Sequence, residues 1–106
     1  MEIWSKSKIE KLISQNPIVI FGKGTKASPQ CGYTLRAIQI IEQCYEIFVV
    51  VNIFDDPSIK QNLKKVSEWP TTPQIFIGGN FVGGSDIIME LFQSGELQKL
   101  IDLAIS

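Results

Sequence analysis

The sequence predicts one α/β domain spanning residues 1–106, with a central mixed four-stranded sheet flanked by helices. Three observations predict this fold class. The runs 18–21 and 47–51 are continuously apolar and rich in β-branched residues, as buried strands are. Apolar residues recur at helical spacing before, between and after these runs. Further along, two short runs joined by Gly78-Gly79-Asn80 indicate an antiparallel hairpin.

The chain is expected to open with a serine-capped amphipathic helix that runs from Ser5 or Ser7 to Asn16 and is ended by a proline. The strand 18–21 follows. Residues 22–30 are predicted to form a loop, because glycine, serine and proline interrupt any periodic pattern there.

A second helix is predicted over 32–44, with an apolar stripe that includes Leu35 and Cys44, and the strand 47–51 follows it. A third helix is expected to begin at Pro57, because proline is tolerated in the first helical turn. One of the two aspartates before that proline would cap it, and a Trp-Pro pair would end it.

The last third of the chain is predicted to hold the hairpin strands 74–77 and 81–83, then a helix capped by Asp86 that runs through Phe92. A glycine separates it from a terminal helix over Glu96–Ile105, in which Leu97, Leu100, Ile101 and Leu103 are apolar. This order of helices and strands is that of a thioredoxin-like domain.

Composition excludes several classes of protein. Ten basic and eleven acidic residues give a net charge of −1, which argues against nucleic-acid binding, because that function needs a clustered basic surface. The absence of histidine excludes Ser-His-Asp and Cys-His triads and histidine-containing metal sites. No apolar run is long enough to cross a bilayer, so no membrane partner is expected. Residues 1–8 carry no export or transit pattern, which predicts a cytoplasmic protein; a mature organellar protein without its presequence would read the same.

Cys31 is the residue best placed for chemistry. It precedes the helix 32–44, whose first N–H groups and dipole favour a thiolate. Thr34 stands where a second cysteine would allow a disulfide, and Cys44 lies about 20 Å further along the helix at roughly 1.5 Å per residue. We therefore expect free thiols in a reducing compartment. Cys44 is interpreted as a core residue, with a redox role as the alternative.

Pro73 directly precedes the strand 74–77, where a proline is unusual unless its geometry is needed. We predict a cis Thr72–Pro73 bond, which would turn the N–H and C=O groups of Thr72 outward to pair with a peptide-like ligand. An ordinary trans proline at the end of a loop is the alternative.

Four separated motifs, which together cover nearly the whole chain, resemble those of the CGFS-type monothiol glutaredoxins. They are Lys23-Gly24-Thr25, Cys31-Gly32-Tyr33-Thr34, Trp69-Pro70-Thr71-Thr72-Pro73-Gln74 and Gly83-Gly84-Ser85-Asp86. The resemblance implies a thioredoxin fold that binds glutathione. It also implies a homodimer that holds a 2Fe-2S cluster with two glutathiones and acts in iron–sulfur cluster assembly and redox homeostasis. Cys31 and one glutathione thiol from each subunit would supply the four thiolates that such a cluster takes.

The resemblance also implies roles for individual residues. Cys31 would be the catalytic thiol and the metal ligand, and Lys23 would pair with a carboxylate of glutathione. Ser85 and Asp86 would receive the glutamyl end at a helix N-terminus. The residues implied to contact glutathione are Lys23, Tyr33, Lys60, Thr72, Pro73, Ser85 and Asp86. Without the motifs, Lys23 would be a solvated surface lysine, and 83–86 would be only a turn and a helix cap.

The chain departs from the family pattern at several places. Lys60 stands where the family usually has arginine, so a two-pronged carboxylate contact becomes a point charge. Tyr33 and Thr34 replace phenylalanine and serine. Lys26 replaces the usual proline, which is expected to loosen its loop. Ser85 replaces a frequent cysteine and leaves no second thiol to resolve a mixed disulfide.

Three functions remain open. The first is a carrier of a 2Fe-2S cluster, bridged between two copies of the chain and delivered to iron–sulfur acceptor proteins. The second is a glutathione-dependent thiol-disulfide oxidoreductase that acts on glutathione mixed disulfides, for which one nucleophilic cysteine suffices. The third is an adaptor whose cluster-bridged complex with a regulatory partner senses iron.

Overall fold

A four-stranded sheet with the order β2-β1-β3-β4 forms the centre of the molecule in the computed structural model, which describes residues 3–106. Its strands are β1 (Ile18–Gly22), β2 (Val49–Asn52), β3 (Gln74–Ile77) and β4 (Asn80–Gly83). Strand β1 pairs in parallel with β2 and antiparallel with β3, which pairs antiparallel with β4. The predicted mixed sheet and thioredoxin-like arrangement are confirmed.

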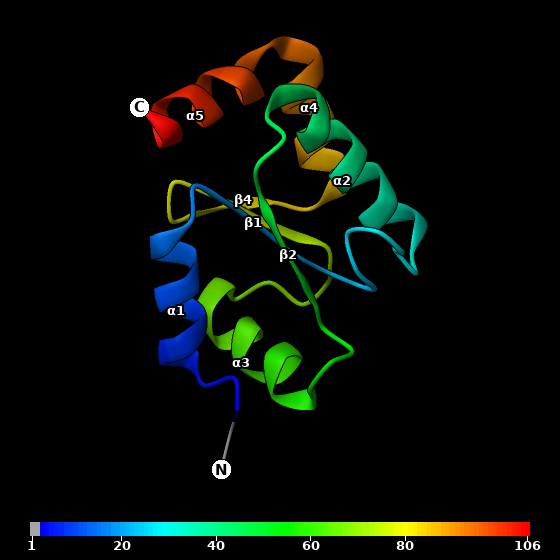
Figure 1. Cartoon of the computed structure of the whole chain (residues 1–106), viewed down its shortest axis with the longest axis vertical. Coiled ribbons are helices and arrows are strands. Elements are labelled where there is room, and N and C mark those ends of the chain that lie inside the picture. The colour runs from blue at the N-terminus through cyan, green and yellow to red at the C-terminus, as the bar shows by residue number, and fades with distance from the viewer. Residues whose placement is uncertain (1–2) are drawn as a thin grey trace.

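In the part of the chain that the structure describes, five helices cover the two faces of this sheet. They are α1 (Lys6–Gln15), α2 (Gly32–Cys44), α3 (Pro57–Ser67), α4 (Ser85–Ser94) and α5 (Glu96–Ile105). Figure 1 shows α1 and α3 on one face and α2, α4 and α5 on the other. Each face has its own hydrophobic core, because β1 is buried along its whole length and alternates its side chains between them. Val19 and Phe21 pack towards α1 and α3, and Ile18 and Ile20 pack towards the other layer.

Two predicted helix starts are confirmed, one capped by a serine and the other by an aspartate. The hydroxyl of Ser5 accepts a hydrogen bond from the N–H of Lys8 at 3.1 Å, and a carboxylate oxygen of Asp56 accepts one from the N–H of Ser58 at 2.8 Å. Helix α4 differs from the prediction. It begins at Ser85 after Gly84, so Asp86 lies within its first turn and does not cap it. A carboxylate there still interacts favourably with the helix dipole.

Two apolar segments lie differently from the prediction. The second strand begins at Val49, two residues later than expected, and Ile47 is 67% exposed. In α2, Ala37, Ile38 and Ile41 are buried as predicted, but Leu35 is 42% exposed and Thr34 is fully buried instead. Thr34, Ala37, Ile38 and Ile41 follow the period of 3.6 residues that Leu35 breaks, and Ile40 is buried beside them.

The hairpin and the terminal helix need smaller corrections. The β3–β4 turn consists of Gly78 and Gly79, at φ +60° and +81°, and Asn80 already belongs to β4. Both glycines occupy the left-handed region that two-residue hairpins require. In α5, Leu97 is buried, whereas Leu103 is largely exposed. Within residues 3–106, no helix combines the length and apolar character needed to span a bilayer.

Candidate functional site

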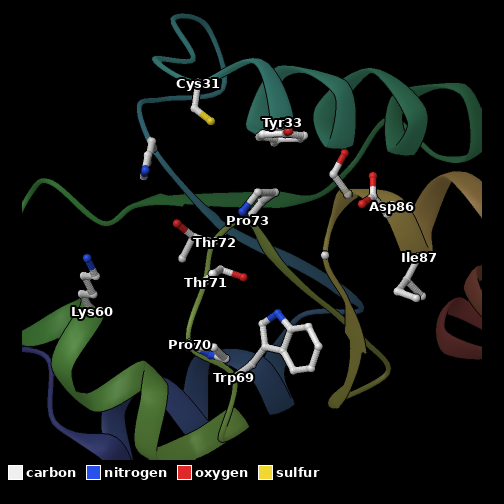
Figure 2. Close-up of a pocket in the computed structure, with 13 residues that line it drawn as sticks. Cys31, Tyr33, Lys60, Trp69, Pro70, Thr71, Thr72, Pro73, Asp86 and Ile87 are labelled. Atoms are coloured by element: carbon white, nitrogen blue, oxygen red, sulfur yellow. The ribbon is translucent and has the colours of Figure 1, made fainter.

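A cleft of about 550 Å³ opens beside Cys31, where both helical layers meet the loop before β3. Figure 2 shows its walls: the start of α2 above, Lys60 of α3 on one side, the loop 69–73 below and the start of α4 on the other side. The residues that line it are Lys23, Cys31, Tyr33, Lys60, Trp69, Pro70, Thr71, Thr72, Pro73, Gly84, Ser85, Asp86 and Ile87. A cleft of this size suits a small ligand.

Cys31 occupies the N-cap position of α2, in extended conformation, so its side chain lies beside the first free N–H groups of the helix. The backbone N–H of Thr34 lowers the pKa of the Cys31 thiol most. Burial opposes this with the second-largest effect, and the N–H of Tyr33 and the charge of Lys23 lower the pKa further. The arrangement therefore favours a thiolate at the mouth of the cleft, as the sequence predicted.

The loop that carries Lys23 is held by side chains from two other elements. The N–H of Lys23 donates to Oγ1 of Thr34 at 3.1 Å, and the N–H of Gly24 donates to Oδ1 of Asn52 at 3.0 Å. Consecutive amides are thereby fixed to α2 and to the end of β2. These two hydrogen bonds set the direction in which the Lys23 side chain leaves the backbone.

Lys26, which stands where a proline is usual, contacts the segment before β2, and the expected loosening of the loop stays a prediction. Its ammonium donates to the carbonyl of Glu46 at 3.3 Å and lies 3.8 Å from the centroid of the Phe48 ring. A cation over an aromatic face is attracted electrostatically. The side chain of Lys26 therefore anchors the loop to the segment before β2.

The loop before β3 forms the floor of the cleft. The Thr72–Pro73 peptide bond is cis, as predicted. The indole of Trp69 lies 5.9 Å from the ring of Phe81 and is 44% exposed. Trp69 therefore packs against Phe81 and also lines the cleft.

The start of α4 forms the far wall. Ser85 is 5% exposed, and its hydroxyl has no hydrogen-bond partner among the described residues. Gly83 adopts a φ of +153°, and a Cβ there would lie 2.8 Å from that of Ile87, so only glycine allows α4 to begin this close to β4. The free hydroxyl and the first N–H groups of α4 can bind an anionic group.

The structure brings all of the predicted site residues to this cleft: Lys23, Cys31, Tyr33, Lys60, Thr72, Pro73, Ser85 and Asp86. Sequence reasoning missed Trp69, Pro70, Thr71, Gly84 and Ile87 as lining residues. All but Ile87 lie within the four sequence motifs, and membership of a motif was the signal that could have identified them. Nothing in the sequence marks Ile87, because its place on the cleft depends on how α4 is tilted.

Cys44 lies at the other end of α2. It is partly buried against the core, and both cysteines are free. Burial, with a further effect of Asp102, raises the pKa of its thiol. No group of three or more His, Cys, Asp or Glu residues within 3–106 is arranged to hold a metal ion. Of the two cysteines, Cys31 lines the cleft and Cys44 does not.

Comparison with known proteins gives the family. The glutaredoxin family model matches residues 18–82, more than half of the chain. An uncharacterized monothiol glutaredoxin, ycf64-like, from Synechocystis is 41% identical over 102 residues, covering 96% of this chain and 95% of the relative. The chain belongs to the monothiol glutaredoxins.

Solved glutaredoxin structures share the fold of this glutaredoxin. Reduced apo GrxS14 of poplar superposes with a TM-score of 0.84 at 41% identity, covering 94% of this chain and 92% of that one. The buckwheat glutaredoxin–glutathione complex superposes with a TM-score of 0.83 at 26% identity, covering 93% and 88% of the two chains.

Proposed function

We propose that this glutaredoxin binds glutathione in the cleft and, as a homodimer with two glutathiones, carries a bridging 2Fe-2S cluster for iron–sulfur cluster assembly and transfer. The observation that carries the proposal is Cys31: a free thiol of lowered pKa at the mouth of the cleft, with Thr34 where a second cysteine would stand. A thiolate without an internal disulfide partner is available as a ligand.

The charges around the cleft match those of glutathione, which has two carboxylates, one ammonium and one thiol. Lys23 lines the cleft and its charge acts on the Cys31 thiol. Lys60 of α3 lies on one side of the cleft, and Asp86, at the start of α4, lies on the opposite side (Figure 2). Lys23 and Lys60 would bind the glycyl carboxylate, and the N-terminus of α4 with Asp86 would bind the glutamyl carboxylate and ammonium. The glutathione complex of the buckwheat glutaredoxin supports this ligand.

The cluster would be cargo that the protein carries and passes on. A 2Fe-2S cluster takes four thiolates, and each chain offers one in its cleft, Cys31. Two glutathione thiols and the Cys31 of a second copy would complete the set. The donor chemistry therefore fits a cluster only when glutathione and a second chain are both present.

The test is anaerobic reconstitution with ferrous iron, sulfide and glutathione, followed by absorption spectroscopy and light scattering. We expect thiolate-to-iron charge-transfer bands, together with conversion of monomer to dimer. Cys31→Ser should abolish both, and the matched control Cys44→Ser should leave both unchanged. Bands that form without glutathione, or a wild-type protein that stays colourless, would contradict the proposal.

A glutathione-dependent oxidoreductase is the second candidate, favoured by the lowered pKa of Cys31. The Cys31 thiolate would attack the glutathionyl sulfur of a mixed disulfide, releasing the target thiolate and forming a Cys31–glutathione disulfide. A second glutathione thiolate would attack that glutathionyl sulfur, releasing oxidised glutathione and the Cys31 thiolate. Rapid turnover of a glutathionylated peptide by the cluster-free protein, lost in Cys31→Ser, would rank this function first.

We further propose that the protein acts in the cytoplasm and delivers its cluster to acceptor proteins or to a regulatory partner. Two free cysteines suit a reducing compartment. Affinity capture with the cluster-loaded form, compared with the apo form, would identify partners that require the cluster. A set of partners identical for both forms would contradict cluster-dependent delivery.

A further inference from the structure

Gln74 is a buried amide directly behind the floor of the cleft. It is the first residue of β3, follows the cis Thr72–Pro73 bond and is 2% exposed. It does not line the cleft. A side chain at this position therefore affects a ligand only through the loop in front of it.

The amide nitrogen of Gln74 donates two hydrogen bonds to that loop. Nε2 lies 3.0 Å from the carbonyl oxygen of Trp69 and 3.0 Å from that of Thr71. Both N–H groups are used, and both acceptors belong to the segment that passes under the ligand site. One side chain thus joins the two ends of a short turn to the first residue of the sheet.

The loop has few other restraints. Pro70 and Pro73 have no N–H group, and no backbone-to-backbone hydrogen bond outside the helices and strands of the described chain involves residues 69–73. At its start, the N–H of Trp69 donates to Oγ of Ser67 at 3.1 Å. The Gln74 amide is therefore the main polar anchor of the loop, and it leaves the N–H and C=O groups of Thr72 free for a ligand.

Within residues 3–106 the other end of the amide is unpaired, so the presence of Gln74 is explained by its two donated hydrogen bonds. Oε1 of Gln74 is buried and has no hydrogen-bond partner among the described residues. An unpaired buried acceptor is unfavourable, and methionine would fill a similar volume without it. The amide is useful here because the carbonyls of Trp69 and Thr71 need donors on the buried side.

We propose that Gln74 is a positioning residue for glutathione: its amide holds the Trp69–Thr72 loop so that the peptide edge of Thr72 faces the ligand. This inference rests on the proposed function, since it assumes that glutathione is the ligand of the cleft. It separates two tasks within the site, because Gln74 sets the peptide edge, whereas the start of α2 sets the thiolate of Cys31.

The test compares Gln74→Met with the wild type in a titration with reduced glutathione, followed by the backbone amide NMR signal of Thr72. We expect about tenfold weaker binding, because two hydrogen bonds that orient the loop are lost. The dependence of the Cys31 alkylation rate on pH should stay unchanged. Ile75→Val, a destabilising change on the same strand that removes no donor, should bind glutathione as the wild type does.

Gln74→Glu serves as a second variant of nearly the same shape. A protonated carboxyl donates one hydrogen bond and a carboxylate donates none, so the ratio of wild-type to variant affinity should increase with pH. Wild-type affinity in both variants, or a Cys31 pH profile that shifts together with the affinity, would overturn the inference alone. Absence of glutathione binding by the wild type would refute the proposed function and this inference with it.

Discussion

Cys31 and Cys44 stand at opposite ends of one helix, and their surroundings move their thiol pKa values in opposite directions. The first N–H groups of α2 and the charge of Lys23 stabilise the thiolate of Cys31. Burial and Asp102 disfavour the thiolate of Cys44. The surroundings of each cysteine therefore decide its chemistry: free N–H groups and a lysine at one end of the helix, and burial near a carboxylate at the other.

The two thiols should separate in an alkylation experiment. In Cys44→Ser, the remaining Cys31 should stay reactive with iodoacetamide at a lower pH than an ordinary thiol does, and its rate should fall only when pH drops through the lowered pKa. In Cys31→Ser, the remaining Cys44 should become reactive only at alkaline pH, because its pKa is raised. Mass spectrometry of quenched samples measures both rates; equal pH profiles would contradict the assignment.

At the same scale, sequence reasoning identified the chemical residues better than the supporting ones. The chemistry of Cys31 followed from its place before a helix, and Thr72–Pro73 followed from a proline at a strand start. Gln74 belongs to one of the four motifs, but no role for it was predicted, because a glutamine at the start of a strand does not show by itself what its amide contacts. Its role depends on two carbonyls that the folded loop turns towards it.

Strand β1 and helix α2 meet at a tightly matched pair. A Cβ on Gly22 would lie 2.6 Å from Cγ2 of Thr34, which is fully buried. The same threonine accepts the N–H of Lys23 through its hydroxyl. The absent side chain of Gly22 therefore makes room for a branched residue in the first turn of α2, and that residue orients the loop of Lys23.

Gly22→Ala should accordingly destabilise the protein by about 1–3 kcal/mol, as overpacking does. Adding Thr34→Ser removes the methyl group and retains the hydroxyl, so the double variant should recover part of the loss. Urea denaturation followed by circular dichroism gives the free energy of unfolding for all four proteins. Additive effects of the two changes would show that the contact does not couple the elements.

For the helices and strands, the sequence predicts type and order well. It predicts less well where each one begins and which of its residues face the core. The apolar run after α2 predicts a strand from Ile47, and the run begins two residues before the strand does. Phe48 is apolar because its ring lies in the core and under Lys26, before the chain pairs with β1. In most of the sheet the buried residues are also the ones that pair with another strand, but Phe48 is buried and lies before the paired segment.

The whole molecule is two cores that share one sheet. Phe21 is fully buried in the core beneath α1 and α3, and its neighbour Ile20 is buried in the core beneath α2, α4 and α5. Because β1 is the central strand bonded to both β2 and β3, neither layer has a sheet to pack against without it. Unfolding should therefore involve both layers together.

Phe21→Ala tests this coupling. It should cost about 3–5 kcal/mol, as loss of a buried aromatic ring does, whereas Leu103→Ala, on the exposed face of α5, should stay within about 0.5 kcal/mol of the wild type. Tryptophan fluorescence reports the layer of α1 and α3. Trp4 packs on that core, and Trp69 contacts Phe81, which packs on the same core. Alkylation of Cys44 reports the other layer, and the two probes should share one urea midpoint; separate midpoints would contradict a single cooperative unit.

The sequence by itself determined the elements, their order, the thiol before a helix and the cis proline, because each depends on local periodicity, a cap or a proline geometry. The resemblance implied that Lys60, Thr72 and Asp86 share a ligand with Cys31, but only the tertiary structure shows how α3, the loop before β3 and α4 bring them to one cleft. It also decided that Thr34, and not Leu35, points inward. These facts depend on the order of the strands and on which face each helix turns to the sheet, and no residue encodes either without its distant neighbours.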